Sequence, residues 1–219
     1  MTTFRHILKL DPHHRETRAV VADAQLMHKA VMAGFDDQLP DRDFFADGTK
    51  PHPTHRADHH ILHAVDTRPD GQIWVMVQAD IPGNWSNARI ADALIEPVEP
   101  AKHTPAANGH IHYQIVANPT FSPAGTRKKF TLTKPAEIEE WWRRKANGIG
   151  LNLDGHRINI MDTQRLRSKT KRGLTLTTTR IGGDGVVVDH DAFTEALRTG
   201  VGRGKAYGCG LLLTLPGRG

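Results

Sequence analysis

Residues 190–216 read HDAFTEALRTGVGRGKAYGCGLLLTLP and contain three kinds of segment in a row. The first segment, 190–199, predicts a short helix that Asp189 or Asp191 can cap at its N-terminus. Five glycines then fall within eleven residues, where they predict a tight loop. The last segment, LLLTLP, is a short apolar run typical of a buried strand. The stretch therefore predicts the helix, connecting loop and final strand of a mixed α and β domain.

The segments before this stretch complete a β-α-β-β-α-β order in the second half of the chain. HIHYQIVA at 110–117 predicts a strand, and 149–162 and 173–189 contain further strand-like pieces. Between them, 135–147 predicts a helix that begins with acidic and ends with basic residues, as the helix dipole favours, and Gly148 can end it. This order is that of a ferredoxin-like (split βαβ) unit.

The first half begins with the same order. FRHILKL at 4–10 alternates as a strand does, and the apolar spacing over 17–34 predicts one helix that stops at Gly34. Residues 36–58 are rich in Asp, Pro, His and Gly, which predicts a long loop.

A hairpin is predicted next. HHILHAV and IWVMVQAD form its strands, and Asp70-Gly71 is the central pair of its turn. Residues 82–93 are rich in turn formers, with a short helix around Asn87–Leu94. The first half thus shows β-α-β-β with a degraded remainder.

The sequence therefore predicts an α+β protein of two tandem ferredoxin-like (βαββαβ, RRM-like) domains. Three prolines and few bulky apolar residues mark 95–109 as a linker. The N-terminal domain is then 1–94, and the C-terminal domain is 110–219.

Composition excludes several classes of protein. The chain has 219 residues and a single cysteine, which excludes a disulfide framework and a cysteine-based zinc site and favours a reducing, cytoplasmic setting. It contains no apolar run of about 18 residues, so no membrane association is expected. The net charge is +5, and the basic excess lies in the C-terminal half, which permits an anionic partner.

The glycine loop is the strongest local feature. Its backbone can contact phosphate through exposed N–H groups, with Arg203 and Lys205 adding positive charge. It is not a nucleotide P-loop, because Thr199 and Ala206 stand where that motif needs Gly and Ser or Thr. The alternative is a tight helix-to-strand connection. The residues assigned to phosphate contact here are Gly200, Gly202, Arg203, Gly204, Lys205, Gly208 and Gly210.

A basic run forms the second feature. Arg165, Arg167, Lys169 and Lys171 alternate with uncharged residues, which on a strand places four cations on one face. Arg172 adds a further cation. Such a hairpin can contact the phosphates of RNA or DNA, and the alternative is a solvated edge that blocks aggregation.

Histidines are the remaining candidates for chemistry. His28 lies beside the apolar stripe of the helix at 17–34, where it can act as a general acid or base; the alternative is a surface or packed histidine. His55, His59 and His63 are spaced by four, but the segment reads as loop and strand, so a polar loop is favoured over a metal site. Cys209 has no positioned base, and no nucleophile–base motif is present.

Four stretches together resemble the CasE family, the CRISPR RNA endoribonucleases of the subtype I-E Cascade complex. They are ADAQLMHKAVMAGF, VMVQADIPGNW, YQIVANPTFSP and DAFTEALRTGVGRGKAYGCGLLL, and they span nearly the whole chain in the family's order. The resemblance implies two ferredoxin-like domains in tandem and cleavage of a repeat hairpin in precursor CRISPR RNA.

The resemblance also implies roles for individual residues. His28 falls at the family's catalytic histidine, and the glycines of the loop fall on its glycine-rich loop. Relatives often have a tyrosine at the position of Gln25, whose amide could orient the 2′-hydroxyl or a phosphate oxygen. The run 165–172 lies where the family's RNA-contacting hairpin would be.

We therefore expect a metal-independent endoribonuclease without a cofactor. The 2′-hydroxyl of the RNA attacks the adjacent phosphorus, His28 transfers a proton, and Lys29, Lys169 or Lys171 stabilises the phosphorane, leaving a 2′,3′-cyclic phosphate. The expected partners are the precursor CRISPR RNA hairpin and other Cascade subunits, with the mature RNA retained. Two alternatives stay open: a non-catalytic RNA-binding scaffold of the same fold, and a histidine-rich metal protein.

Overall fold

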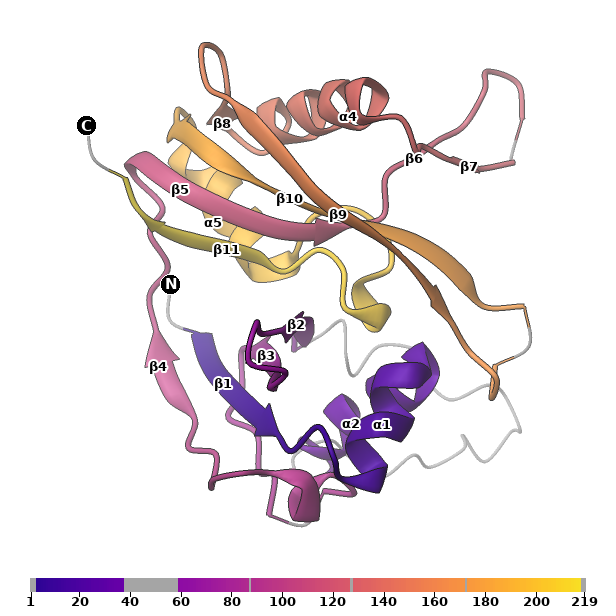
Figure 1. The fold of residues 1–219 in the computed structure, drawn as a ribbon. Helices are drawn as coiled ribbons and strands as arrows, with labels where there is room; N and C mark the ends of the chain where they lie inside the picture. The colour runs from indigo at the N-terminus through magenta and orange to yellow at the C-terminus, as the bar shows by residue number, and fades with distance from the viewer. Residues whose placement is uncertain (1–2, 38–58, 87, 127, 172, 218–219) are drawn as a thin grey trace, which may run out of the picture. The chain divides into compact units, whose positions relative to one another are not determined.

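The computed structural model describes residues 3–37, 59–86, 88–126, 128–171 and 173–217 (Figure 1). By its contacts the chain divides into two compact units. The N-terminal unit comprises Met1–Thr104 and Ser168–Gly173, and the C-terminal unit comprises Pro105–Arg167 and Leu174–Gly219. The segment Ser168–Gly173 thus joins the unit that is far from it in sequence.

The N-terminal unit is built on a four-stranded antiparallel sheet. Its strand order is β2-β3-β1-β4, the order of a ferredoxin-like fold, in which β3 lies between β1 and β2. One short 3-10 helix, η1, stands where that fold has its second helix. The elements are β1 (Thr3–Leu10), α1 (Arg15–Ala22), α2 (Ala24–Ala33), β2 (Leu62–Thr67), β3 (Ile73–Ala79), η1 (Ala91–Ala93) and β4 (Ala101–His103).

The single helix predicted over 17–34 is two helices, α1 and α2. The chain is extended at Asp23, with φ −139° and ψ 110°, and the Asp23 side chain accepts hydrogen bonds from the N–H groups of Gln25 and Leu26. A short polar side chain that bonds to nearby N–H groups competes with a continuous helix, so Asp23 ends α1 and caps α2. Gly34 follows α2 as predicted.

The predicted hairpin is formed by β2 and β3, but its turn is shifted by one residue. Gly71 donates its N–H to the carbonyl of Arg68, which makes Pro69 and Asp70 the central pair. Gly71 follows them at φ 84°, a left-handed conformation that glycine adopts without strain. The short helix predicted around 87–94 is only η1, and the predicted loop at 36–58 lies almost entirely outside the described residues.

The stretch predicted as a linker, 95–109, contains the edge strand of the first sheet. β4 pairs with β1 in the register Thr3 with His103 and Arg5 with Ala101. A strand of three residues is too short to show an alternating pattern. The neighbouring prolines are typical of loops, so the sequence does not indicate a strand here. The connection between the units is therefore shorter than predicted.

The core of the N-terminal unit covers one face of its sheet. Apolar side chains of α1, α2, β1 and β3 pack there, and the buried His6 of β1 lies among them. The His6 ring makes edge contacts with Phe35 and Trp85, with ring centroids 6.0 and 5.7 Å away. Its Nε2 accepts a hydrogen bond of 2.8 Å from the N–H of Gly83.

The C-terminal unit is a second sheet of the same order. Its strands run β11-β5-β10-β8, and β9 also pairs with β10. The helix predicted at 135–147 is α4, and Asp189 caps α5 by accepting from the N–H of Ala192. The elements are β5 (Gly109–Ala117), β6 (Thr120–Phe121), β7 (Phe130–Thr131), α4 (Pro135–Asn147), β8 (Leu151–Asn152), β9 (Ile158–Arg167), β10 (Thr175–Val187), α5 (His190–Thr199), η2 (Lys205–Tyr207) and β11 (Leu212–Pro216).

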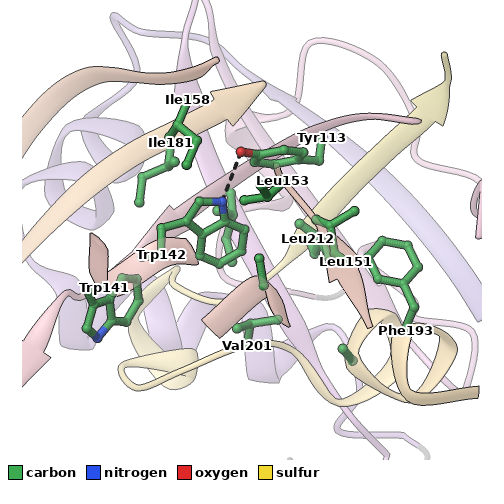
Figure 2. Packing of buried hydrophobic residues seen from close by; sticks show 14 of the residues in the cluster. Tyr113, Trp141, Trp142, Leu151, Leu153, Ile158, Ile181, Phe193, Val201 and Leu212 are labelled. Atoms are coloured by element: carbon green, nitrogen blue, oxygen red, sulfur yellow. Dashed lines mark hydrogen bonds between the residues drawn. The ribbon is translucent and has the colours of Figure 1, made fainter. Parts of the chain in front are cut away.

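Helices α4 and α5 bury aromatic side chains against one face of this sheet (Figure 2). The Trp142 Nε1–H donates to the Tyr113 hydroxyl over 3.0 Å, so the indole finds a polar partner inside the core. Phe193 of α5 is fully buried in the same cluster. With this packing both halves of the chain have the predicted tandem ferredoxin-like fold.

Strands β9 and β10 form a long ribbon that continues beyond the part of β10 paired with β5 (Figure 1). The predicted strand with four cations on one face is shorter than expected. β9 ends at Arg167, so Arg165 and Arg167 share a face, whereas Lys169 and Lys171 lie in the following turn. Side-chain hydrogen bonds of Ser168 favour this turn over further pairing, since its Oγ accepts from the N–H of Lys171 at 2.7 Å.

The buried His6 predicts an acid-sensitive fold. Burial lowers the pKa of His6 to about 4. The unfolded chain binds a proton at this histidine below a pH of about 6.5, whereas the folded chain does not bind it until about pH 4. The free energy of unfolding should therefore fall as the pH falls from about 6.5 to about 4, by up to about 3 kcal/mol.

Urea unfolding at several pH values, compared with His6→Gln, measures this contribution. Glutamine can accept the Gly83 hydrogen bond but does not titrate, so the variant should lose less stability on acidification. Parallel curves for the two proteins would show that His6 does not cause the acid sensitivity.

Candidate functional site

Helix α2 presents Gln25, His28 and Lys29 along one side. Met27, Ala30 and Val31 of the same helix are buried in the core, which fixes the rotation of α2. His28 and Gln25 are therefore half-buried at the edge of this apolar face, and Lys29 is exposed. The imidazole is neither enclosed in the core nor fully in solvent, and this position suits a residue that exchanges protons with a bound molecule.

Asp23 stands directly before α2 and is buried, with 3% of its surface exposed. Its Oδ1 caps the helix by accepting from the N–H groups of Gln25 at 2.8 Å and Leu26 at 3.2 Å. Its Oδ2 accepts from the backbone N–H groups of Lys169 at 2.8 Å and Thr170 at 3.0 Å. One carboxylate thus joins α2 to the turn that carries two of the predicted cations.

The electrostatics of Asp23 follow from these contacts. Burial by itself raises the pKa of this carboxyl group, but the Ser168 side chain and the backbone N–H groups of Thr170, Lys169 and Leu26 lower it by more. The net effect holds the pKa of Asp23 well below its usual range, so the group is a carboxylate at neutral pH.

The basic run is therefore divided between two places in the structure. Lys169 and Lys171 are exposed in the turn of the N-terminal unit. Arg165 and Arg167 are exposed on β9 of the C-terminal unit, and within the described ranges neither forms an ion pair with a carboxylate. Asp162, earlier on β9, pairs instead with Arg180, with Nε and Oδ1 3.3 Å apart. Arg172 lies outside the described residues.

All five glycines of the loop after α5 have positive φ, between 76° and 86°. At two of them the fold itself demands glycine. Gly200 ends α5 with φ 77° and ψ 160°, and a Cβ at Gly210 would lie 2.7 Å from the carbonyl oxygen of Val201. Gly210 also donates its N–H to Val116 of β5, which closes the loop onto the sheet. Part of the glycine pattern is thus explained by a tight connection.

The exposed part of the loop has a different character. No hydrogen bond from the N–H groups of Gly202, Arg203 or Gly204 occurs within the part of the chain that the structure describes. Arg203 is exposed, and Lys205 begins the short helix η2, which ends before Gly208. Successive backbone N–H groups beside cationic side chains can bind an oxyanion.

The glycine loop and the two arginines do not form one surface. A Cβ at Gly204 would lie 3.7 Å from Leu176 of β10, so the loop lies against the side of the ribbon that bears Leu176. Leu176 pairs with Leu166, and alternation along β9 turns Arg165 and Arg167 to the other side. The predicted phosphate contacts of the C-terminal unit therefore lie on two faces of the ribbon.

The other candidates do not come together as sites. His55 lies outside the described residues, while His63 is buried in β2. Among the residues that the structure describes, no group of three or more histidine, cysteine or acidic side chains could hold a metal ion. Cys209 is buried, and burial raises the pKa of its thiol to about 12, which excludes a thiolate at neutral pH.

Asp23, Ser168 and Thr170 are not among the site residues that the sequence predicts. Asp23 was placed inside a continuous helix, although an Asp before an apolar helical stripe is a capping signal. No sequence pattern connects it to residues 168–170, because the hydrogen bonds span 146 positions.

No described helix is long and apolar enough to cross a bilayer.

Comparison with known proteins agrees with this architecture. A family model described as CRISPR associated protein matches residues 4–216. The CRISPR-associated endoribonuclease Cse3 of Thermus thermophilus is 29% identical over 153 residues, which are 65% of this chain and 72% of that protein.

Solved structures are similar over nearly the whole chain. The Thermus thermophilus Cse3 bound to an RNA representing a pre-cleavage complex has a TM-score of 0.79 and 25% identity, and the match covers 99% of this chain and 100% of that one. The CRISPR-associated protein Cas6e of Escherichia coli K-12 has a TM-score of 0.62 and 17% identity, over 99% and 100% of the two chains, and shares the fold. The chain belongs to the CRISPR-associated proteins, and among these to the CasE family of subtype I-E.

Proposed function

We propose that this protein is a metal-independent endoribonuclease that cleaves the repeat hairpin of precursor CRISPR RNA. The relative named as an endoribonuclease supports the reaction class, and the relative described as bound to a pre-cleavage RNA supports the substrate class. In the reaction, the ribose 2′-hydroxyl attacks the adjacent phosphorus and the 5′-oxygen of the next nucleotide leaves. The products carry a 2′,3′-cyclic phosphate and a 5′-hydroxyl.

The observation that carries the proposal is that one compact unit contains both the helix with His28 and the turn with Lys169 and Lys171. The Lys169 backbone is 2.8 Å from Asp23, and His28 follows Asp23 by about 7.5 Å of helix rise. An acid–base group and cations in one unit are what this cleavage needs, since protons move and negative charge develops on the phosphorane.

RNA supplies its own nucleophile, so the protein needs only to move protons and stabilise charge. We assign proton transfer to His28, at either the 2′-hydroxyl or the leaving 5′-oxygen. Lys29, Lys169 or Lys171 would stabilise the charge on the non-bridging oxygens. Gln25, one helical turn before His28 and Lys29, would orient the 2′-hydroxyl or a phosphate oxygen by hydrogen bonding.

Binding would use the phosphates and the shape of the RNA. The major groove of A-form RNA is too narrow for side chains to read, so contacts to the backbone dominate. The exposed Arg165 and Arg167 of β9 would contact phosphates from one face of the ribbon. The N–H groups at 202–204, with Arg203 and Lys205, would contact phosphate at the glycine loop.

In this proposal the protein is a subunit of the Cascade complex and keeps the cleaved RNA bound. Its RNA partner is the precursor hairpin, and its protein partners are the other Cascade subunits. A second candidate is an RNA-binding scaffold in which His28 has only a structural role; the departure from tyrosine at Gln25 keeps this candidate open.

Replacement of His28 separates the two candidates. His28→Ala should lower the single-turnover rate of hairpin cleavage by about 10²-fold or more, because it removes a proton-transfer group, while the RNA Kd changes little. The exposed His13 offers a matched control, and His13→Ala should cleave at the wild-type rate. Equal cleavage by wild type and His28→Ala would favour the scaffold.

The substrate itself tests the nucleophile. A 2′-deoxy nucleotide just upstream of the scissile phosphate should abolish cleavage, because the attacking oxygen is missing, whereas a chelator should leave cleavage of the natural RNA unchanged. Analysis of product ends by phosphatase and kinase treatment reports the cyclic phosphate. Cleavage of the deoxy substrate, or inhibition by chelator that added metal reverses, would refute the proposed mechanism.

Salt dependence tests the phosphate contacts on β9. The association constant K falls as the salt concentration rises, so the slope of log K against log salt concentration is negative. Each cation that contacts a phosphate should make this slope steeper by about 0.7 to 0.9. Arg165→Ala and Arg167→Ala should each make the slope shallower by about that amount. Arg144→Ala is the control, since Arg144 of α4 pairs with Glu140, and its slope should match that of the wild type. Unchanged slopes in both β9 variants would remove these arginines from the interface.

A further inference from the structure

The carboxylate of Asp23 accepts hydrogen bonds from two segments at once, and its two oxygens accept from different backbone N–H groups, while the Thr170 hydroxyl reaches both oxygens. Oδ1 accepts from the first turn of α2, as an N-cap does. Oδ2 accepts from the N–H groups of Lys169 and Thr170, and the Thr170 hydroxyl donates to it over 3.2 Å. A side chain that served only as a cap would need only the first oxygen.

Among the described residues of 105–219, only the segment that Asp23 holds belongs by its contacts to the N-terminal unit. It is short, and its residues Lys169, Thr170 and Lys171 are exposed, with positive charge on the two lysines. Turns of this kind are mobile unless something ties them down. Here the buried carboxylate of Asp23 holds the turn through hydrogen bonds. Hydrogen bonds to an ionised acceptor are stronger than those between neutral groups.

We propose that Asp23 is a positioning residue for the RNA cleavage proposed above: it holds the turn Ser168–Gly173 against the N-terminus of the helix that bears His28. The link fixes the backbone of Lys169 relative to the start of α2. Stabilisation of a phosphorane by a cation depends on the cation being held in place before the reaction, so release of the turn should slow chemistry more than binding.

The two tasks of Asp23 can be separated by mutation. Asparagine is an N-cap as good as aspartate, so Asp23→Asn keeps the cap of α2 through its side-chain oxygen. Its amide NH₂ group then faces the N–H groups of Lys169 and Thr170 and cannot accept from them. The variant therefore releases the turn and leaves the helix capped.

Amide hydrogen exchange in the RNA-free protein tests the link by itself. The N–H groups of Lys169 and Thr170 should exchange at least about 10-fold faster in Asp23→Asn than in the wild type, whereas the amides within α2 should be unchanged. Asp92→Asn, at an exposed acid of η1, is the control and should alter neither set. Equal protection of Lys169 and Thr170 in Asp23→Asn and the wild type would overturn the proposal.

Cleavage kinetics test the positioning role. Asp23→Asn should lower the single-turnover rate constant by about 10- to 100-fold while the RNA Kd changes by less than about 3-fold. Ser168→Ala removes one hydrogen bond to the same carboxylate and should cause a smaller loss of rate. Ser168→Ala also removes the hydrogen bond that its Oγ accepts from the N–H of Lys171, so the double variant should be slower than Asp23→Asn by less than the loss that Ser168→Ala causes alone.

Two other results have distinct meanings. Faster exchange of the turn with an unchanged cleavage rate would overturn the positioning role. Absence of cleavage by the wild type itself would overturn the proposed function, and the exchange measurement would still report whether Asp23 holds the turn.

Discussion

The carboxylate of Asp23 joins parts of the chain that are 146 positions apart, and the arrangement of the candidate site depends on it. A buried negative charge is unfavourable unless hydrogen-bond donors surround it, and here the donors come from both α2 and the turn Ser168–Gly173. The same bonds end helix α1, begin helix α2 and assign the turn to the N-terminal unit. One saturated carboxylate therefore places the cationic turn beside the helix of His28.

The rest of the N-terminal unit supports this arrangement through one-sided burial. The sheet packs its helices on one face, so α2 turns Met27, Ala30 and Val31 inward. Gln25 and His28 then lie at the margin of the core, and Lys29 lies in solvent. The apolar stripe determines the rotation of the helix, and this rotation keeps the polar residues of α2 out of the core.

The glycine loop contains glycines that the fold requires and an exposed part for which we propose phosphate contact. Gly200 and Gly210 have conformations or close contacts that exclude a side chain, so the connection from α5 to β11 requires them. Gly202 is exposed, and the N–H groups that begin there have no acceptor within the described chain. The count of glycines could not distinguish these roles, because both produce the same residue type.

Local patterns in the amino-acid sequence were enough to predict the β-α-β-β-α-β order of the second half, the limits of α4 and α5, and His28 on a helix beside an apolar stripe. These features depend on periodicity and capping over a few residues. The sequence alone could not show that β4 pairs with β1, that β9 ends at Arg167 or that Asp23 holds the turn after it. Each of these depends on hydrogen bonds between segments that are distant in the sequence. Only the folded chain determines which segments pair, because burial requires each donor and acceptor to have a hydrogen-bond partner.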